Sequence, residues 1–414
     1  MASGSPSRRR DFRLLLFGQT TAQLGTQVSG VAVPLLAVVT LGASPLQLGL
    51  VTAAGTVAFA LIGLPAGAWI DRWPRRPVLV AADLARAALL ATIPLAALLG
   101  RLTITQLVVV SLLAGVARVF FDVGYQSYLP AVADRTGLLA GNSAMETVRA
   151  CGQVAGPGVG GWAVALLGAA NVVLVQAVTF ALSAASLLAI RAREPAPPAA
   201  RPGRLAAEIG EGLAFVARNR LLRATAITSA AGNLAFAIAS AVNVVFMVRT
   251  LGLTPAAIGL VLAAGSVAAL AGAALTPRLA RRAGSARIIW LSLAVTGPAA
   301  MLTPLSGPGR PVLLLVLGTA AGELGQIVYA ITNVSLRQRL CPERMLGRVN
   351  ATMRVLMMGL FPVGALLGGA LGQAAGTRPV LWLAAAVIAL SPLPVHAALR
   401  GVRDVEDLPA WTRP

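Results

Sequence analysis

The chain has 414 residues, of which 57% are hydrophobic and only 12% charged, and its mean hydropathy is +0.80. A water-soluble protein of this length needs many more charged residues on its surface, so the composition excludes that class and indicates a membrane protein. The net charge of +20 rests on 34 basic residues, all arginine, against 14 acidic ones.

Apolar stretches of about 20 residues, long enough to cross a hydrocarbon core of roughly 30 Å, recur along the chain. Strand-like alternation is absent, which leaves helices as the way to satisfy the backbone in lipid. We therefore predict an all-α membrane protein with twelve transmembrane helices. The predicted spans are residues 14–40, 46–70, 77–99, 103–127, 141–167, 170–190, 222–248, 255–276, 286–305, 311–334, 347–374 and 378–399.

The arginines are distributed unevenly between the loops on the two sides of the membrane. Only Arg101, Arg249, Arg310 and Arg378 lie in loops that face outward if the N-terminus is inside. This bias places both termini in the cytoplasm and the protein in the inner (plasma) membrane. A nucleic-acid-binding surface would need basic residues clustered on one folded face, so no nucleic-acid partner is predicted.

A polar segment divides the chain near its middle. It is rich in proline and is followed by Leu205, Ile209, Leu213 and Val216 at helical spacing. We predict an N-terminal six-helix bundle at 1–190, a cytoplasmic linker with an amphipathic helix at 191–221, and a C-terminal six-helix bundle with a tail at 222–414. The tail from Arg400 onward is polar and is predicted to be mobile.

The two halves repeat each other. Residues 42–55 (GASPLQLGLVTAAG) align with residues 252–265 (GLTPAAIGLVLAAG) at a constant offset of 210. A parallel repeat of six plus six helices implies two pseudo-symmetric bundles with a binding site between them.

The loop after the second span carries a family signature. Gly67-Ala-Trp-Ile-Asp71-Arg72-Trp-Pro-Arg75-Arg76 resembles the G-x-x-x-D-R-x-G-R-R motif of the major facilitator superfamily, with Pro74 at the usual glycine. The resemblance implies the major facilitator fold and an inner gate locked by a charge cluster of Asp71, Arg72, Arg75 and Arg76. It also implies that Asp71 pairs across the bundle interface when the transporter faces outward. The alternative is ordinary positive flanking of a membrane span.

The fifth span contains a second motif. Gly152, Gly156, Pro157, Gly160 and Gly161 match the superfamily's G-x-x-x-G-P-x-x-G-G antiporter motif, which is similar to that of exporters rather than importers. Small residues four apart allow close helix packing, and a proline can kink the helix. Generic small-residue packing is the alternative.

Further stretches indicate the branch. Residues 118–130, 335–339, 347–351 and 361–369 resemble the drug/macrolide-efflux and enterobactin-exporter-like group of the superfamily. This resemblance covers nearly the whole chain and does not identify a substrate.

Polar residues inside spans are candidates for function because they are costly in lipid. They gather on spans 1, 4, 7 and 10, which line the central cavity in this superfamily. The substrate-cavity candidates are Gln19, Gln23, Gln27, Tyr125, Asn233, Asn243, Gln326, Tyr329 and Asn333. Spans 3, 6, 9 and 12 read as mostly apolar, lipid-facing supports.

Two carboxylates are candidates for proton coupling, Glu323 and Asp122. Glu323 has no basic residue within a helical turn, so its protonation can follow the side to which it is exposed. We predict that Glu323 is a proton-coupling or cationic-substrate site. The alternative is a structural carboxylate that is hydrogen-bonded to Gln326 or to a neighbouring helix.

Two close pairs, Arg118 with Asp122 and Glu146 with Arg149, occupy spans 4 and 5. We interpret them as a charge network that belongs to the gate, and a direct role in substrate or proton binding is the alternative.

The resulting hypothesis is a secondary active transporter that exports small molecules, as in multidrug efflux and antibiotic resistance, by proton antiport with alternating access. An importer or facilitator of a small polar metabolite is the alternative. A phosphate-binding P-loop needs a lysine, which this chain lacks, and one histidine with two separated cysteines predicts neither an enzyme nor a metal site. The expected partners are the lipid bilayer, a small-molecule substrate and protons; no cofactor is predicted beyond the proton gradient, and the chain is expected to be a monomer.

Overall fold

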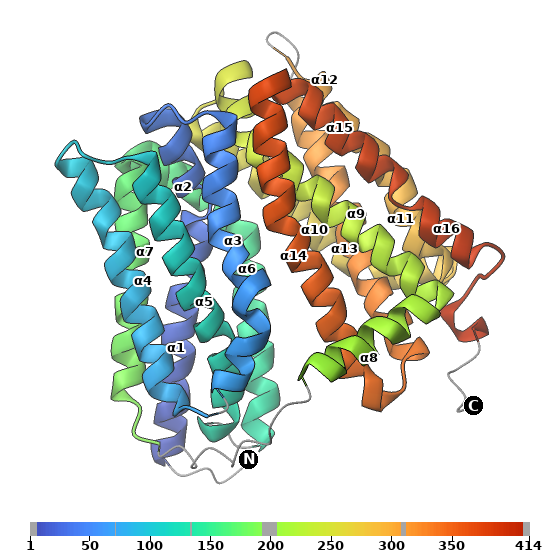
Figure 1. Ribbon diagram of the computed structural model, residues 1–414, viewed down its shortest axis with the longest axis horizontal. Coiled ribbons are helices and arrows are strands. Elements are labelled where there is room, and N and C mark those ends of the chain that lie inside the picture. The colour runs from blue at the N-terminus through green and yellow to red at the C-terminus, as the bar shows by residue number, and fades with distance from the viewer. Residues whose placement is uncertain (1–5, 71, 133–134, 193–204, 308–311, 409–414) are drawn as a thin grey trace. The chain divides into compact units, whose positions relative to one another are not determined.

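The computed structural model describes residues 6–70, 72–132, 135–192, 205–307 and 312–408, and these ranges contain helices and no strand (Figure 1). Within them, twelve helical stretches are long and apolar enough to cross a membrane. The predicted all-α membrane protein with twelve spans is confirmed. Helices dominate because each one satisfies its own backbone hydrogen bonds without water.

The helices form two compact units. Unit 1 comprises Met1–Ala43, Leu50–Arg201 and Leu253–Leu260. Its helices are α1 (Pro6–Ser29), α2 (Ala32–Leu35), a π-helical turn (Leu36–Thr40), α3 (Pro45–Ile70), α4 (Arg75–Leu98), α5 (Ile104–Val132), α6 (Arg135–Leu167) and α7 (Ala169–Ala189). Here α4 packs against α5 and α7, and α1 packs against α6 and α7.

Unit 2 comprises Ser44–Gly49, Pro202–Gly252 and Val261–Pro414. Its helices are α8 (Leu205–Arg218), α9 (Arg220–Val245), a π-helical turn (Phe246–Thr250), α10 (Pro255–Ala283), α11 (Arg287–Thr296), a 3-10 turn (Gly297–Met301), α12 (Leu302–Leu305), α13 (Leu313–Leu340), α14 (Glu343–Ala375), α15 (Thr377–Leu390), α16 (Leu393–Leu399) and a 3-10 turn (Val405–Asp407). Here α9 packs against α14 and α15.

The sequence repeat has a structural counterpart. The first span of each half ends in a π-helical turn, closed by Leu41 N–H to Leu36 O at 3.2 Å and by Leu251 N–H to Phe246 O at 3.1 Å. A glycine with positive φ follows in both places, +62° at Gly42 and +66° at Gly252. That left-handed backbone disfavours any residue with a β-carbon, so both halves keep glycine here.

The helices that follow begin in the same way. α3 and α10 both start at a proline, whose fixed φ suits the first helical position. The hydroxyls of Ser44 and Thr254 each accept a hydrogen bond of 3.3 Å from the amide three residues on. One capping solution therefore serves both halves.

The repeated glycines Gly49 and Gly259 are contact points. A β-carbon on Gly49 would lie 2.6 Å from the carbonyl oxygen of Ala365 in unit 2, and one on Gly259 would lie 2.8 Å from Cα of Gly161 in unit 1. Gly49 and Ala365 both belong to unit 2, and Gly259 and Gly161 both belong to unit 1. The first turns of α3 and α10 therefore pack within these units, and the rest of each helix belongs to the other unit.

Two side chains, Asp11 and Arg76, bind the backbone at the end of α7. Asp11, which is buried, accepts hydrogen bonds from the amides of Arg191 (3.2 Å) and Ala192 (2.7 Å). Arg76 Nε donates to the carbonyl oxygen of Leu187 at 2.9 Å. The bond from Arg76 satisfies a carbonyl group that the end of a helix leaves free, and Asp11 satisfies the amides of the segment that follows α7.

The predicted amphipathic helix is present as α8. It packs against α14 and α9, and its Val216 is buried. Glu211 forms an ion pair with Arg348 of α14. The proline-rich segment that precedes α8 lies outside the described residues.

The expected mobility of the tail from Arg400 is wrong for its described part. Ser285 N–H donates to Asp404 Oδ1 at 2.8 Å, and Val405 N–H donates to Ser285 Oγ at 2.7 Å. Val405 and Leu408 are buried in a hydrophobic cluster. These hydrogen bonds and the burial of two apolar residues hold the tail against the connection between α10 and α11.

The same cluster encloses Cys341, which is 6% exposed. Burial raises the pKa of the Cys341 thiol to about 11, with Arg337 acting in the opposite and smaller direction. Only the thiolate reacts readily with maleimides. In a Cys151→Ser background we expect slow labelling at pH 8 and faster labelling as the pH rises toward 11, followed by mass spectrometry of the intact protein.

A variant that detaches the tail provides the comparison for the rate at which Cys341 is labelled. Val405→Asp should speed labelling of Cys341 at pH 8, because Val405 belongs to the cluster that covers it. Labelling of the parent at the rate of a free thiol would contradict the burial described here.

Candidate functional site

Glu323 lies within α13 and is half-buried beside α10. A β-carbon on Gly265 would come within 3.2 Å of Glu323 Cγ, so this glycine makes room for the side chain. Within the part of the chain that the structure describes, Glu323 forms no hydrogen bond or ion pair. Gln326, which was considered as its structural partner, is exposed and does not bond to it. A carboxylate without a counter-charge in a span can change its protonation at low structural cost.

Tyr329 and Asn333, one turn apart on α13, are buried in a hydrogen-bonded contact with α9. The Tyr329 hydroxyl lies 2.7 Å from Ser229 Oγ and donates to Thr225 O at 3.1 Å. Asn333 Nδ2 donates to Ser229 Oγ at 3.4 Å, and Asn233 Nδ2 donates to Ser229 O at 2.9 Å. These bonds join α9 to α13, although the buried side-chain oxygen of Asn333 has no partner among the described residues. A role in a substrate cavity stays a prediction.

The other cavity candidates are spread over α1, α5 and α9. Gln23 and Tyr125 are half-buried, and Tyr125 stacks on Phe121 with ring centroids 6.2 Å apart. The side-chain oxygens of Gln19 and Asn243 are buried and have no hydrogen-bond partner among the described residues. Unpaired buried amides are costly, so these two can accept a bond from a ligand or a water.

The glycines of the antiporter motif bring α6 against α1. A β-carbon on Gly152 would lie 3.1 Å from Gln27 Cγ, and one on Gly156 would lie 2.7 Å from Gln27 Cβ. A β-carbon on Gly160 would overlap the carbonyl oxygen of Val28. The motif is therefore a surface of close helix contact, with a polar glutamine from α1 lying against it.

The structure describes only part of the predicted gate and charge network. Asp71 and the side chain of Glu146 lie outside the described residues. Arg72 and Arg149 are exposed, and Arg75 is half-buried. The gate therefore stays a prediction. What the structure adds is that Arg76 supports the end of α7.

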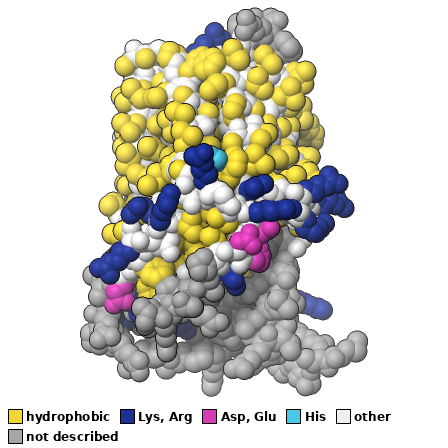
Figure 2. Space-filling view, turned by 90° about the vertical axis from the view of Figure 1, so that its right-hand side faces the viewer, with side chains coloured by type: hydrophobic (Ala, Val, Ile, Leu, Met, Phe, Trp, Pro, Cys, Tyr) yellow, Lys and Arg dark blue, Asp and Glu magenta, His cyan; other side chains and the backbone are white. Residues whose placement is uncertain are grey.

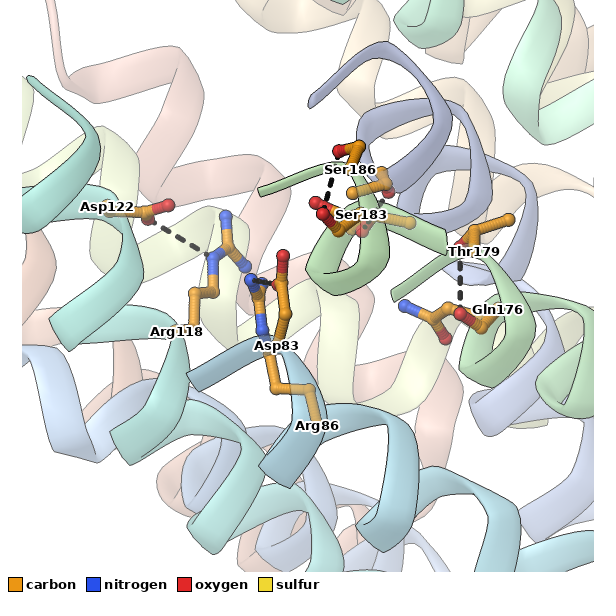
Figure 3. Close-up of polar contacts among 10 residues, drawn as sticks. Asp83, Arg86, Arg118, Asp122, Gln176, Thr179, Ser183 and Ser186 are labelled. Carbon is orange, nitrogen blue, oxygen red and sulfur yellow. Dashed lines mark hydrogen bonds and ion pairs between the residues drawn. The ribbon is translucent and has the colours of Figure 1, made fainter. Parts of the chain in front are cut away.

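The predicted Arg118–Asp122 pair is formed on α5, with Nε and Oδ2 3.5 Å apart (Figure 3). Side-chain exposures of 62% and 35% make it an open contact. Pairs of this kind contribute little to stability.

A second pair, which the sequence analysis did not assign, lies beside it on α4. Arg86 donates through a guanidinium nitrogen to Asp83 Oδ1, and both residues are buried (Figure 3). The guanidinium carbon lies 4.4 Å from the ring centroid of Phe121 and 4.1 Å from that of Phe180. Two aromatic faces and one carboxylate thus hold the arginine away from lipid.

This pair corrects the view of the third span as a plain apolar support. Asp83 and Arg86 are three residues apart and so lie on one helical face, a spacing visible in the sequence. Only the fold shows Phe180 of α7 and Phe121 of α5 closing around them. Figure 3 places Asp122 and Arg118 next to the pair, so four charges of α4 and α5 act on one another.

The chain is similar in sequence to known transport proteins. The sequence profile of a family described as "Transmembrane secretion effector" matches residues 1–410. The chain is 32% identical to the multidrug efflux pump Tap of Mycolicibacterium fortuitum over 378 residues, 89% of this chain and 91% of that protein. It is 30% identical to the multidrug efflux pump Tap of Mycobacterium tuberculosis over 416 residues, covering 97% and 96% of the two chains.

Solved structures share the fold at low identity. A bacterial homologue of the iron transporter ferroportin has a TM-score of 0.76 at 17% identity, covering 95% of this chain and 99% of that one. A bacterial homologue of the human lysosomal transporter Spinster has a TM-score of 0.73 at 14% identity and covers all of both chains.

The contact between α6 and α1 predicts an intolerance of β-carbons. Gly156→Ala and Gly160→Ala should each destabilise the protein by about 1–3 kcal/mol, because backbone atoms of α1 would have to move. Thermal unfolding of the purified protein in detergent measures this. Gly359→Ala is the control, since nothing lies within 4 Å of a β-carbon there. Equal unfolding temperatures for all three variants would contradict the contact.

The buried pair predicts a non-additive double variant. Asp83→Leu alone leaves the Arg86 charge buried and should cost about 3–5 kcal/mol of stability. Adding Arg86→Met, whose flexible thioether suits the space between Phe121 and Phe180, should recover most of that loss. Thermal unfolding of the two variants in detergent decides it: a double variant no more stable than Asp83→Leu would show that the pair is not the unit we describe.

Proposed function

The chain belongs to the transmembrane secretion effector family of major facilitator transporters, and we propose on that basis that it exports small molecules by proton antiport. It is a multi-pass membrane protein and a transporter rather than an enzyme. Export is supported by the name of its relatives, multidrug efflux pumps, which align over nearly the full length of this chain. The glycine and proline pattern on α6 supports the same direction.

Coupling to protons is supported by one observation above the others, the isolated carboxylate of Glu323. It lies in a span, is half-buried, and has no counter-charge among the described residues. A charged side chain in a membrane span is costly unless it is paired or hydrated, so an unpaired carboxylate there is a candidate for proton exchange as its exposure changes. A group of this kind can exchange a proton for a substrate as access alternates.

Asp122 is the weaker candidate. Its partner Arg118 lies one helical turn away, and the buried Asp83–Arg86 pair lies beside it. Asp122 therefore has a basic partner within the described residues, which Glu323 lacks. We therefore assign coupling to Glu323 and a structural part in the charge cluster to Asp122.

The substrate is proposed to be a drug or another natural product of low charge. The candidate side chains on α1, α5, α9 and α13 are amides and phenols rather than charged groups. Amides and phenols bind by hydrogen bonding and apolar contact, which suits neutral or weakly cationic compounds.

The experiment is drug accumulation in energised cells of an efflux-deficient host that express the chain, with and without a protonophore. We expect lower accumulation of at least one compound in a panel of macrolides, dyes and a siderophore, and loss of that effect with the protonophore. Glu323→Gln should abolish the energised difference, because the amide cannot carry the proton. Asp122→Asn should retain at least part of it.

Glu406→Gln is the matched control, since Glu406 is a carboxylate outside the spans and the amide can still accept the Ser285 hydroxyl bond. Full activity in Glu323→Gln at every external pH would remove the proposed coupling site. Increased accumulation in cells that express the parent chain would favour the importer alternative.

A further inference from the structure

A groove lined by arginines lies in unit 2, apart from the residues discussed so far. We call it the arginine groove and define it by Arg282, Arg287, Trp290, His396 and Arg400. Its volume is about 500 Å³, within the range of roughly 300–1,000 Å³ that small-molecule sites occupy. The groove is formed where the end of α10, the start of α11 and the end of α16 meet.

The lining of the groove is basic. Arg282, Arg287 and Arg400 are exposed, and none of the three side chains forms a hydrogen bond or ion pair within the described part of the chain. No acidic residue lines the groove. The acidic side chains of the nearby tail lie outside the lining, where Asp404 and Glu406 accept hydrogen bonds from Ser285. Three free guanidiniums around one space favour an anion with several acceptor oxygens.

The position of the groove relates it to the membrane. Its arginines lie at or next to the ends of three membrane spans, Pro255–Ala283, Arg287–Leu305 and Thr377–Leu399. Figure 2 shows this face: a broad hydrophobic surface with arginine side chains and the chain's histidine along its lower border. The groove therefore opens at the depth where lipid headgroups meet the hydrocarbon.

Two further features fit a lipid. The Trp290 indole is held edge-on against His396, with ring centroids 4.4 Å apart, and tryptophan is typical of the membrane interface. The span Thr377–Leu399, which ends at the groove, exposes large apolar side chains, with Leu390 at 60% and Leu393 at 56% exposure. A soluble anion would use the arginines and leave these leucines without a partner.

We propose that the arginine groove binds the headgroup of an anionic glycerophospholipid. The phosphodiester oxygens accept hydrogen bonds from Arg282, Arg287 and Arg400, the indole of Trp290 lies beside the glycerol region, and the acyl chains run along Leu393 and Leu390. Basic pockets between spans at the membrane surface recognise anionic headgroups in this way. The site goes beyond the proposed transport function and does not depend on it.

The test measures lipid binding by the full chain. The protein is purified in detergent, delipidated, and titrated with phosphatidylglycerol, with phosphatidylcholine, and with inorganic phosphate, with bound molecules counted by native mass spectrometry. We expect phosphatidylglycerol to bind more tightly than phosphatidylcholine by about tenfold. The triple variant Arg282→Gln/Arg287→Gln/Arg400→Gln should lose that preference.

The control variant also replaces three arginines with glutamine, at positions outside the groove. Arg13, Arg278 and Arg281 are exposed, lie outside the groove, and can be changed together to glutamine. This control should keep the preference for phosphatidylglycerol. Thermal unfolding without lipid checks that both triple variants fold, and Arg287→Gln alone replaces the groove triple if that variant does not.

Three outcomes would overturn the proposal. The groove variant retains the preference; or the control loses as much as the groove variant, which indicates a diffuse charge effect; or inorganic phosphate displaces phosphatidylglycerol and binds equally well, which indicates a soluble phosphate ligand instead.

Discussion

The absence of water from the hydrocarbon core governs both the packing and the charges of this protein. It obliges the backbone to close its hydrogen bonds inside helices and makes each charge in a span expensive. The helices then pack without a hydrophobic driving force between them, so close contact has to come from small residues. Gly156 and Gly160 of α6 supply it against α1, where a β-carbon would meet the backbone of Gln27 or Val28.

The same constraint sorts the charges of the chain into three groups. Asp83 and Arg86 are buried as a pair, enclosed by Phe121 and Phe180, and their contact offsets part of the cost of burying them. Glu323 has no such partner among the described residues. Most arginines avoid the problem by lying at the ends of spans, and those of the arginine groove do so around a common space.

The two halves show which parts of the repeat matter physically. The segments that align at an offset of 210 share a π-helical turn, a glycine with positive φ, a hydroxyl cap and a proline at the helix start. Each is a backbone requirement, and a side chain with another shape would not meet it. The charged residues are not repeated in this way. The Asp83–Arg86 pair belongs to one half and Glu323 to the other.

Sequence alone determined the spans, the repeat, the amphipathic helix and the motif glycines, because these depend on composition and on local periodicity. It also placed Arg118 one turn from Asp122. Only the tertiary structure decided what each polar group meets: that Tyr329 and Asn333 bond to Ser229, that Arg76 holds α7, and that Val405 and Leu408 fasten the tail. Such partners come from helices distant in the chain, so no local pattern specifies them. Burial between packed helices, rather than the type of residue, separates a structural polar group from one that is free to act.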